Sequence, residues 1–497
     1  MRLMLSTSII LTLSTRAVAQ EQRDQSLRYR LVDLGTFSGP ASYFANGFDG
    51  ILNNHGTAVG WANTAEPDPT CSDLSCYHAH AFKAHNGHIK DLGALPGGNE
   101  SHAYWISANG LIAGDSHNDE VDPIAGFPEN HGVLWRNGEI IDLGTLPEGG
   151  YDSLATAVNN RGTVVGFALN TVPDPFSLVG FPLQTRAFLW QDGVMQDLGT
   201  LGGPDAIAGL INDRGEVAGI SYPPIDPAIG SPVVHPFLWY NGTMIDLGSL
   251  GGTDSEPTGL NQNGQVVGFS SLAGDTMTHP FIWKNGQLKD LGTLGGNSGT
   301  TNWINDRGEI AGKADLPGPA PQDHDAVLWR EGRKIDLGTF PGDSCSNAYF
   351  VNMRGQVVGT SESRDLCHMG VGEHAFLWQH GQMIDLNTVI PPGATLQLTY
   401  AVAINDRGEI AGYGVPIGCD PKDYEICGHA YVLLPCDDGD ECVNVANGAT
   451  NIDSAAKSAP QDVTAHSAAN PAAVPKQLGN IFGNGIRYPR RRISHSD

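Results

Sequence analysis

The chain has 497 residues, of which 54 are acidic and 28 are basic, and its formal net charge at pH 7 is −26. A surface of this sign repels phosphate backbones and anionic lipid headgroups, so the composition argues against nucleic-acid binding and against a membrane-surface role. The 64 glycines and 31 prolines suit many short strands joined by tight turns, which predicts an all-β fold.

The first 19 residues have the pattern of a signal peptide (1–19). Arg2 supplies a positive charge, the stretch 3–13 is apolar, and Ala17 and Ala19 form a small-residue cleavage pattern before Gln20. The apolar stretch is too short to span a bilayer, although a signal anchor is the alternative. We therefore expect a secreted protein, extracellular or periplasmic. No later apolar run approaches about 18 residues, so we expect no membrane insertion.

Four short segments then recur in fixed order across residues 27–442. The first is typified by "AFLW" at 187–190 and the second by "IDLG" at 245–248, and turns such as Asn241-Gly242 join them as adjacent antiparallel strands. The third ends in "IN" and the fourth begins with "EIAG", as in "INDRGEIAG" at 304–312. Asn and Gly there suit a tight turn between two strands. Six of the nine tryptophans share one position of the first segment: Trp135, Trp190, Trp239, Trp283, Trp329 and Trp378.

Each unit is therefore a four-stranded meander of the kind that forms a propeller blade. The array begins with "LVDLG" at 31–35, which lacks a first segment, and ends with "HAYVLL" at 429–434, a first segment without successors. The two ends of the array should complete one blade. We predict a β-propeller of eight blades; seven blades with an irregular appendage and an open β-solenoid are the alternatives.

The joint recurrence of "HAFLW" at 374–378, "DLGTLGG" at 197–203 and "INDRGEIAG" resembles the repeat of the bacterial HAF family of probable extracellular repeat proteins. The similarity covers residues 29–434. It implies export and a repeated β architecture. Because the role of that family is uncharacterised, the resemblance implies no reaction and carries over no catalytic residue.

Two polar positions recur with the strands, and equivalent copies argue against a single ligand site. We interpret the aspartates of "DLG" as strand-end hydrogen-bond acceptors. The histidines before the first segment are interpreted as buried side chains that bond neighbouring backbone. The aspartates are Asp33, Asp91, Asp142, Asp197, Asp246, Asp290, Asp336 and Asp385, and the histidines are His80, His131, His235, His279, His374 and His429.

Eight cysteines agree with an oxidising compartment, and their spacing is not that of a zinc site. Local spacing predicts four disulfides: Cys71 with Cys76, Cys345 with Cys367, Cys419 with Cys427, and Cys436 with Cys442. We predict no cofactor and no metal site. Calcium in the acidic loop of Asp437, Asp438, Asp440 and Glu441 is the alternative to plain solvated charge. Residues 443–497 are poor in apolar side chains and are predicted to be a disordered tail.

For function, the sequence favours a monomeric binding or scaffold module that recognises a protein or a glycan through the long loops between the fourth segment and the next first segment. Phe176, Phe181 and Tyr222 stand in two of these loops, and such rings can anchor a ligand or pin the loop to the propeller. The alternative is an extracellular hydrolase or lyase acting on a polymer. Ionisable residues that break the repeat, namely His117, Asp119, Glu120, Arg364 and Asp365, are too few to define catalytic residues.

Overall fold

A computed structural model of the chain describes residues 27–45, 50–68, 76–124, 126–147, 149–225, 230–319, 323–367, 371–436, 442 and 445–446. The predicted signal peptide, Cys71, the acidic loop 437–441 and all of the predicted tail except 445–446 lie outside these residues.

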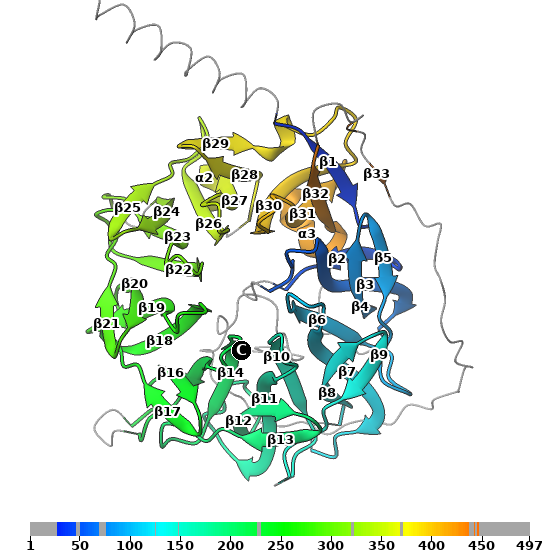
Figure 1. The fold of residues 1–497 in the computed structure, drawn as a ribbon, viewed down its shortest axis with the longest axis vertical. Helices are drawn as coiled ribbons and strands as arrows, with labels where there is room; N and C mark the ends of the chain where they lie inside the picture. The colour runs from blue at the N-terminus through cyan, green and yellow to red at the C-terminus, as the bar shows by residue number, and fades with distance from the viewer. Residues whose placement is uncertain are drawn as a thin grey trace, which may run out of the picture.

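The described residues form a β-propeller of eight four-stranded antiparallel blades arranged in a ring (Figure 1). In each blade the strand nearest the centre comes first, and the chain then moves outward strand by strand. Blades 1 to 4 consist of β2 (Ser38–Tyr43), β3 (Thr57–Pro67), β4 (Tyr77–His85), β5 (His88–Asp91); β6 (Ser101–Ile106), β7 (Ile112–Val121), β8 (Pro128–Arg136), β9 (Glu139–Asp142); β10 (Ser153–Val158), β11 (Val164–Pro173), β12 (Leu183–Gln191), β13 (Val194–Asp197); and β14 (Ala206–Ile211), β15 (Val217–Ser221), β16 (His235–Tyr240), β17 (Thr243–Asp246).

Blades 5 to 7 consist of β18 (Gly251–Leu260), β19 (Val266–Leu272), β20 (Thr278–Lys284), β21 (Gln287–Asp290); β22 (Gly299–Ile304), β23 (Ile310–Asp315), β24 (His324–Arg330), β25 (Arg333–Asp336); and β26 (Cys345–Val351), β27 (Val357–Glu362), β28 (His374–Gln379), β29 (Gln382–Asp385). Short helical segments are α2 (Arg364–Cys367), η1 (Leu386–Thr388), η2 (Pro421–Asp423) and α3 (Tyr424–Cys427).

Blade 8 joins the two ends of the array. It combines β30 (Leu396–Ile404), β31 (Ile410–Pro416) and β32 (His429–Pro435) with β1 (Tyr29–Asp33) as its outer strand. β1 pairs with β32 in register from Tyr29 opposite Pro435 to Asp33 opposite Tyr431, and β33 (Val445–Ala446) adds to β1 in parallel. The predictions of eight blades and of a shared blade are confirmed.

The "IN-DRG" turn does more than reverse the chain. Asn305 Oδ1 accepts the backbone N–H groups of Arg307 and Glu309, and Gly308 takes a φ of 79° as predicted. Asn305 Nδ2 also donates to the carbonyl oxygen of Asn352 in the next blade, at 2.9 Å. The same bond recurs around the ring, and Asn405 Nδ2 closes it on Asn53 O at 3.0 Å. The repeated Asn therefore ties neighbouring blades at seven of the eight junctions; at the eighth, where Ser107 replaces Asn, Asn109 Nδ2 donates to Asn160 O at 2.8 Å.

The glycine of "EIAG" lies opposite a bulge on the inner strand. In blade 3 the pairing of β10 with β11 shifts between Ala155 and Ala157. A Cβ on Gly166 would lie 1.9 Å from Leu154 O, so no larger residue fits opposite the bulge. The other seven blades show the same approach of 1.9 to 2.1 Å at Gly60, Gly114, Gly219, Gly268, Gly312, Gly359 and Gly412.

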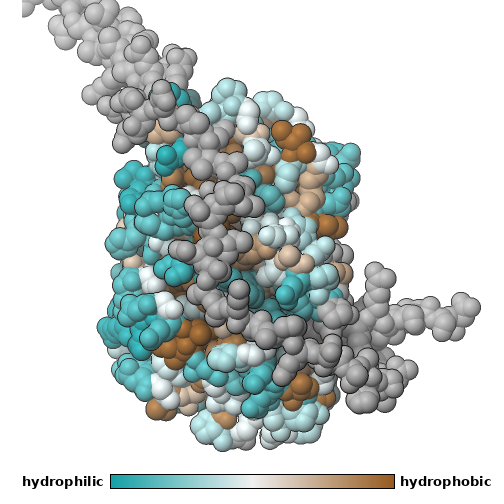
Figure 2. All heavy atoms as spheres, turned by 90° about the vertical axis from the view of Figure 1, so that its right-hand side faces the viewer, coloured by the Kyte–Doolittle hydropathy of each residue, from teal (hydrophilic) through white to brown (hydrophobic). Residues whose placement is uncertain are grey.

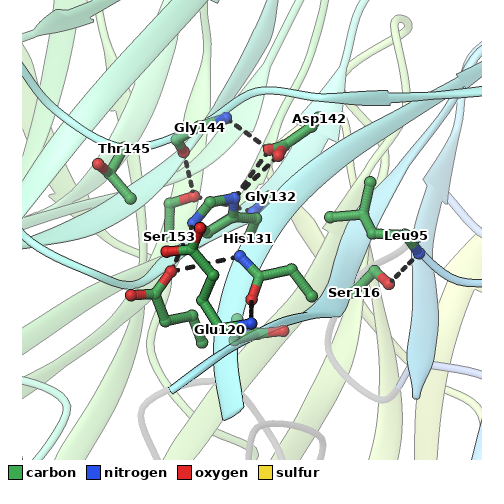
Figure 3. Close-up of polar contacts among 12 residues, drawn as sticks. Leu95, Ser116, Glu120, His131, Gly132, Asp142, Gly144, Thr145 and Ser153 are labelled. Atoms are coloured by element: carbon green, nitrogen blue, oxygen red, sulfur yellow. Dashed lines mark hydrogen bonds and ion pairs between the residues drawn. The ribbon is translucent and has the colours of Figure 1, made fainter. Parts of the chain in front are cut away.

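The hydrophobic core lies between adjacent blades. Buried serine hydroxyls there form hydrogen bonds with backbone groups of the neighbouring blade. Ser153 at the start of β10 accepts the N–H of Gly132 at 2.9 Å and donates to Gly144 O at 2.6 Å, both in blade 2 (Figure 3). On the rim, the space-filling side view shows hydrophobic residues scattered among hydrophilic ones (Figure 2). Disulfides join Cys345 to Cys367, Cys419 to Cys427 and Cys436 to Cys442, which confirms three predicted pairs.

Candidate functional site

Two faces of the ring follow from the strand order. The turns from first to second strand and from third to fourth strand share one face, which we call the hairpin face. The connections from second to third strand and from blade to blade share the other, which we call the long-loop face. A binding site has to be sought where the blades differ from one another at either face.

The repeated histidines and aspartates form a structural pair. His131 Nδ1 lies 2.9 Å from Asp142 Oδ1, which also accepts the N–H of Gly144 (Figure 3). Aspartate pairs of this kind recur at His80, His235, His279 and His429, whereas His374 turns to Asp343. The prediction of strand-end acceptors is confirmed. The expected backbone partner of the histidines is wrong, because their ring nitrogens face carboxylates that hold the outermost strand.

In the His131–Asp142 pair, the contact shifts the pKa of both partners. Burial raises the pKa of Asp142, but the His131 contact and the Gly144 N–H outweigh it and leave that pKa lowered. For His131, burial lowers the pKa, but Asp142 and Glu129 reverse this and the pKa is raised. The His131–Asp142 pair thus favours imidazolium with carboxylate, and the five geometrically equivalent pairs leave no distinctive site.

The first two strands of blades 1 and 2 carry a cluster of aromatic and ionisable side chains. We call Trp61, Glu100, His102, Tyr104, Asp115 and His117 the histidine–aromatic cluster. The His102 ring lies 5.2 Å from Trp61, edge to face, and 6.2 Å from Tyr104, nearly parallel. His102 Nδ1 is 3.5 Å from Asp115 Oδ1, and its Nε2 is 3.8 Å from Glu100 Oε1. Rings and carboxylates therefore meet near the long-loop ends of β3, β6 and β7.

Two protonation states in this cluster differ from the usual ones. Burial raises the pKa of Asp115, but contacts with His102 and Tyr104 outweigh it, so the pKa is lowered and the carboxylate is charged at neutral pH. Burial lowers the pKa of His117 to about 4, helped by His102 and His78, although Asp115 opposes the shift. His117 is therefore a neutral imidazole at pH 7, with Nδ1 3.5 Å from Glu100 Oε2.

The repeat-breaking residues singled out in the sequence do not gather in one place. His117 belongs to the histidine–aromatic cluster, while Asp119 and Glu120 follow it on exposed positions of β7. Arg364 lies on α2 in blade 7, where it pairs with Asp323 at 2.8 Å, and Asp365 beside it is exposed. Only His117 thus contributes to the cluster.

The three loop aromatics have different environments. Phe176 is 42% exposed, Phe181 is half-buried and Tyr222 is 4% exposed. The Tyr222 hydroxyl donates to Phe176 O at 2.9 Å, so this ring pins the loop that presents Phe176. Leu178 of the same loop shares a hydrophobic cluster with Tyr104 and Leu154. The loop 174–182 therefore packs, at the long-loop face, into the same hydrophobic cluster as Tyr104.

Buried carboxyl pairs anchor two of the long loops. Asp174 of blade 3 faces Asp205 at the start of blade 4, and these residues are 4% and 0% exposed. Burial and the neighbouring Asp174 raise the pKa of Asp205 to about 7, although backbone N–H groups of Leu178 and Thr185 oppose the shift. One blade earlier, burial and Asp122 raise the pKa of Asp152 to about 7 in the same way.

Sequence reasoning missed the contribution of three tryptophans. Trp61, Trp105 and Trp303 fall outside the repeat position that the other six occupy. Trp61 lies in the histidine–aromatic cluster, and Trp105 and Trp303 end two inner strands at the hairpin face. Their departure from the repeat was the available signal.

No known family model and no curated protein sequence matches the chain. Among solved structures, the chain is similar to the β-propeller domain of the trilobed protease from Pyrococcus furiosus, with 10% identity and a TM-score of 0.39 over 72% of this chain and 98% of that one. It is also similar to the Pyrococcus horikoshii acylaminoacyl peptidase (12% identity, TM-score 0.39, 79% of this chain and 58% of that one). TolB from Acinetobacter baumannii is a third such structure (11% identity, TM-score 0.29, 83% and 97%). These similarities to solved structures concern the fold alone.

Among the residues that the structure describes, no helix has the length and apolar character to cross a membrane.

Proposed function

We propose that the chain is a secreted binding module that recognises a glycan at the long-loop face, over the histidine–aromatic cluster. The observation that carries this proposal is the row of half-buried rings, Trp61 and His102, flanked by the Glu100 carboxylate. Ring faces suit the C–H faces of sugars, and carboxylates accept hydrogen bonds from sugar hydroxyls.

Of the two partners that the sequence leaves open, this chemistry favours the glycan over the protein. The side chains of Glu100, His102 and His117 are 20%, 21% and 24% exposed, so each retains a surface that a small polar group can reach. The neighbouring loop 174–182 is held from below by Tyr222 and offers Phe176 as a second ring. Preorganised rings and loops lose little conformational entropy on binding.

Secretion is supported by the three disulfides of the described residues, because such bonds persist in oxidising compartments. The signal peptide and the HAF resemblance point the same way and remain proposals. Fractionation of cells that express the full chain, followed by N-terminal sequencing of the mature protein, tests both export and the cleavage site.

The binding test screens the purified chain against cell-envelope and extracellular polysaccharides. His102→Gln and Glu100→Gln should weaken binding of any glycan that is retained, each by about tenfold, since the first removes a ring that can stack on a sugar and the second removes a charged hydrogen-bond acceptor. His235→Gln is the matched control, because His235 pairs with Asp246 on the outer strands and lies far from the cluster. Equal affinity of all three variants for the glycan would contradict the proposal.

A polymer-cleaving enzyme is the second candidate, and the His102–Asp115 pair is the observation that favours it. A carboxylate that orients an imidazole is one arrangement for general acid–base catalysis. Its test is the appearance of new reducing ends in the polysaccharides that bind. Cleavage that His102→Gln abolishes and His235→Gln leaves intact would favour the enzyme, and binding without cleavage would favour the module.

A further inference from the structure

A cavity of about 280 Å³ opens at the hairpin face, where the inner strands end. We call it the hairpin-face cavity. Its wall consists of residues of the "IN-DRG" turns and the last residues of the inner strands, and all eight blades contribute to it. The hairpin face looked featureless in the sequence, because its turns are short and uniform, but this cavity is not uniform.

Three aromatic rings line the cavity, and all come from inner-strand ends that the repeat fills with smaller or aliphatic residues elsewhere. Trp303 and Phe350 stack with centroids 4.8 Å apart. The Trp105 indole lies over Gly50, where a Cβ would come within 2.2 Å of the ring. Trp105 also packs against the hydrophobic clusters of blades 3 to 5, so its ring reaches across the centre of the propeller.

The charge around these rings has one sign. Asp213, Asp306 and Asp406 line the cavity, and among its described lining residues there is no Lys, Arg or His. The three arginines that follow these aspartates are already paired two residues on, as Arg214 with Glu216, Arg307 with Glu309 and Arg407 with Glu409, at 2.5 to 2.7 Å. The aspartates accept only neutral donors: Asp306 Oδ1, for example, accepts the N–H of Gln262 at 2.8 Å. Among the described residues, no ion pair involves Asp213, Asp306 or Asp406.

We propose that the hairpin-face cavity binds a small organic ammonium ion, with the cation against the faces of Trp105 and Trp303 and the three aspartates supplying the negative potential. Ring faces attract cations through their quadrupole, and the attraction grows when water is excluded. A neutral sugar gains nothing from three carboxylates without a basic partner. A volume of about 280 Å³ accommodates an organic ammonium ion of the size of choline. This site lies on the opposite face from the proposed glycan site and does not depend on it.

The test compares choline with its neutral isostere 3,3-dimethylbutan-1-ol, by calorimetry and by tryptophan fluorescence of the full chain. Choline should bind at least about tenfold more tightly than the isostere, since only the charge differs. Asp306→Asn should weaken choline binding about threefold to tenfold, and high salt should weaken it further. Asp192→Asn is the matched control, because Asp192 is exposed in a turn of the same face and does not line the cavity.

Trp303→Leu should abolish most of the choline affinity. The affinity for the neutral isostere should change much less. Because this change can also disturb packing with Phe350, circular dichroism and the thermal midpoint establish folding, and the exposed Asp306→Asn provides the reading if Trp303→Leu fails to fold. Equal binding of choline and the isostere would overturn the proposal. So would choline binding that Asp306→Asn leaves unchanged, or the absence of binding by both choline and tetramethylammonium.

Discussion

Substituting Asp174 by Asn tests how the loop beside the histidine–aromatic cluster is held. Asp174 Oδ1 accepts the N–H of Phe176 at 2.8 Å, while its buried Oδ2 has no hydrogen-bond donor among the described residues. That oxygen faces Asp205, whose two oxygens already accept the N–H groups of Leu178 and Thr185 at 2.7 and 2.9 Å. With Asn at position 174, the side-chain oxygen still accepts the N–H of Phe176, and the amide nitrogen can donate a hydrogen bond to Asp205.

The magnitude follows from that exchange. A buried hydrogen bond to a charged acceptor contributes about 2 kcal/mol, so Asp174→Asn should stabilise the fold by about that amount when Asp205 is ionised. The gain depends on pH. In the folded protein burial and Asp174 raise the pKa of Asp205 to about 7, whereas in the unfolded chain the carboxyl titrates near 4. Wild-type stability therefore falls as the pH rises from about 4 to about 7, and the loss is complete above the folded pKa.

Thermal midpoints of wild type and Asp174→Asn at pH 4.5 and pH 8 measure this effect. At pH 8 the variant should melt about 2 °C higher, the shift that about 2 kcal/mol produces in a chain of this size. At pH 4.5 the difference should nearly vanish. Asp119→Asn, at an exposed position, should change neither midpoint. A gain of equal size at both pH values, or a loss at pH 8, would refute the idea that two facing carboxyls share this site.

Three further substitutions probe the repeat itself. Gly166→Ala should destabilise by more than about 3 kcal/mol, because the new Cβ meets Leu154 O, whereas nothing lies within 4 Å of a Cβ on Gly318, and Gly318→Ala should leave the denaturation midpoint in urea unchanged. Asn405→Ala removes the bonds to Asn53 O and to two backbone N–H groups, and should lower the unfolding free energy by about 3 kcal/mol; a loss below about 1 kcal/mol would contradict a closing role. Replacing Cys345 and Cys367 by Ser opens a loop with a sequence separation of 22 and should lower the unfolding free energy by about 3 kcal/mol. The pair is confirmed if the variant and wild type have the same midpoint under reducing conditions but different midpoints under oxidising conditions. Equal midpoints of the two proteins under both conditions would contradict it.

The fold was accessible from the sequence because its local signals agree with one another in every copy. Asn305 and Gly308 form the same turn as their counterparts in other blades. The incomplete segments at 31–35 and 429–434 pair with each other as β1 and β32. Repetition removed the usual ambiguity of short apolar runs. Eight statements of one pattern fix strand order and closure even though each statement alone is weak.

The sites were less accessible because they arise between blades. Asp174 and Asp205 meet across a blade boundary, and nothing in the local sequence of either residue announces the other. The partner of His131 was also misjudged. Its ring reaches Asp142 on the neighbouring strand, a contact that depends on strand register and not on the backbone nearby. Register between third and fourth strands would have supplied this partner, had it been combined with the turn positions.

A repeated fold also contains its own comparison set, and this changes how a polar or aromatic residue is interpreted. At the end of the inner strand, blades 3, 4 and 8 show that Ala157, Leu210 and Ala403 satisfy the packing. Folding therefore does not require the rings of Trp105 and Trp303 at the equivalent places. At the position of His102 and Asp115, blades 3 and 4 pair Leu154 with Phe167 and Ile207 with Ile220, so folding does not require ionisable groups there. Where other blades fold with smaller or aliphatic residues at the equivalent place, binding explains a half-buried ring or ionisable group more economically than folding does, and such groups occur near both ends of the inner strands.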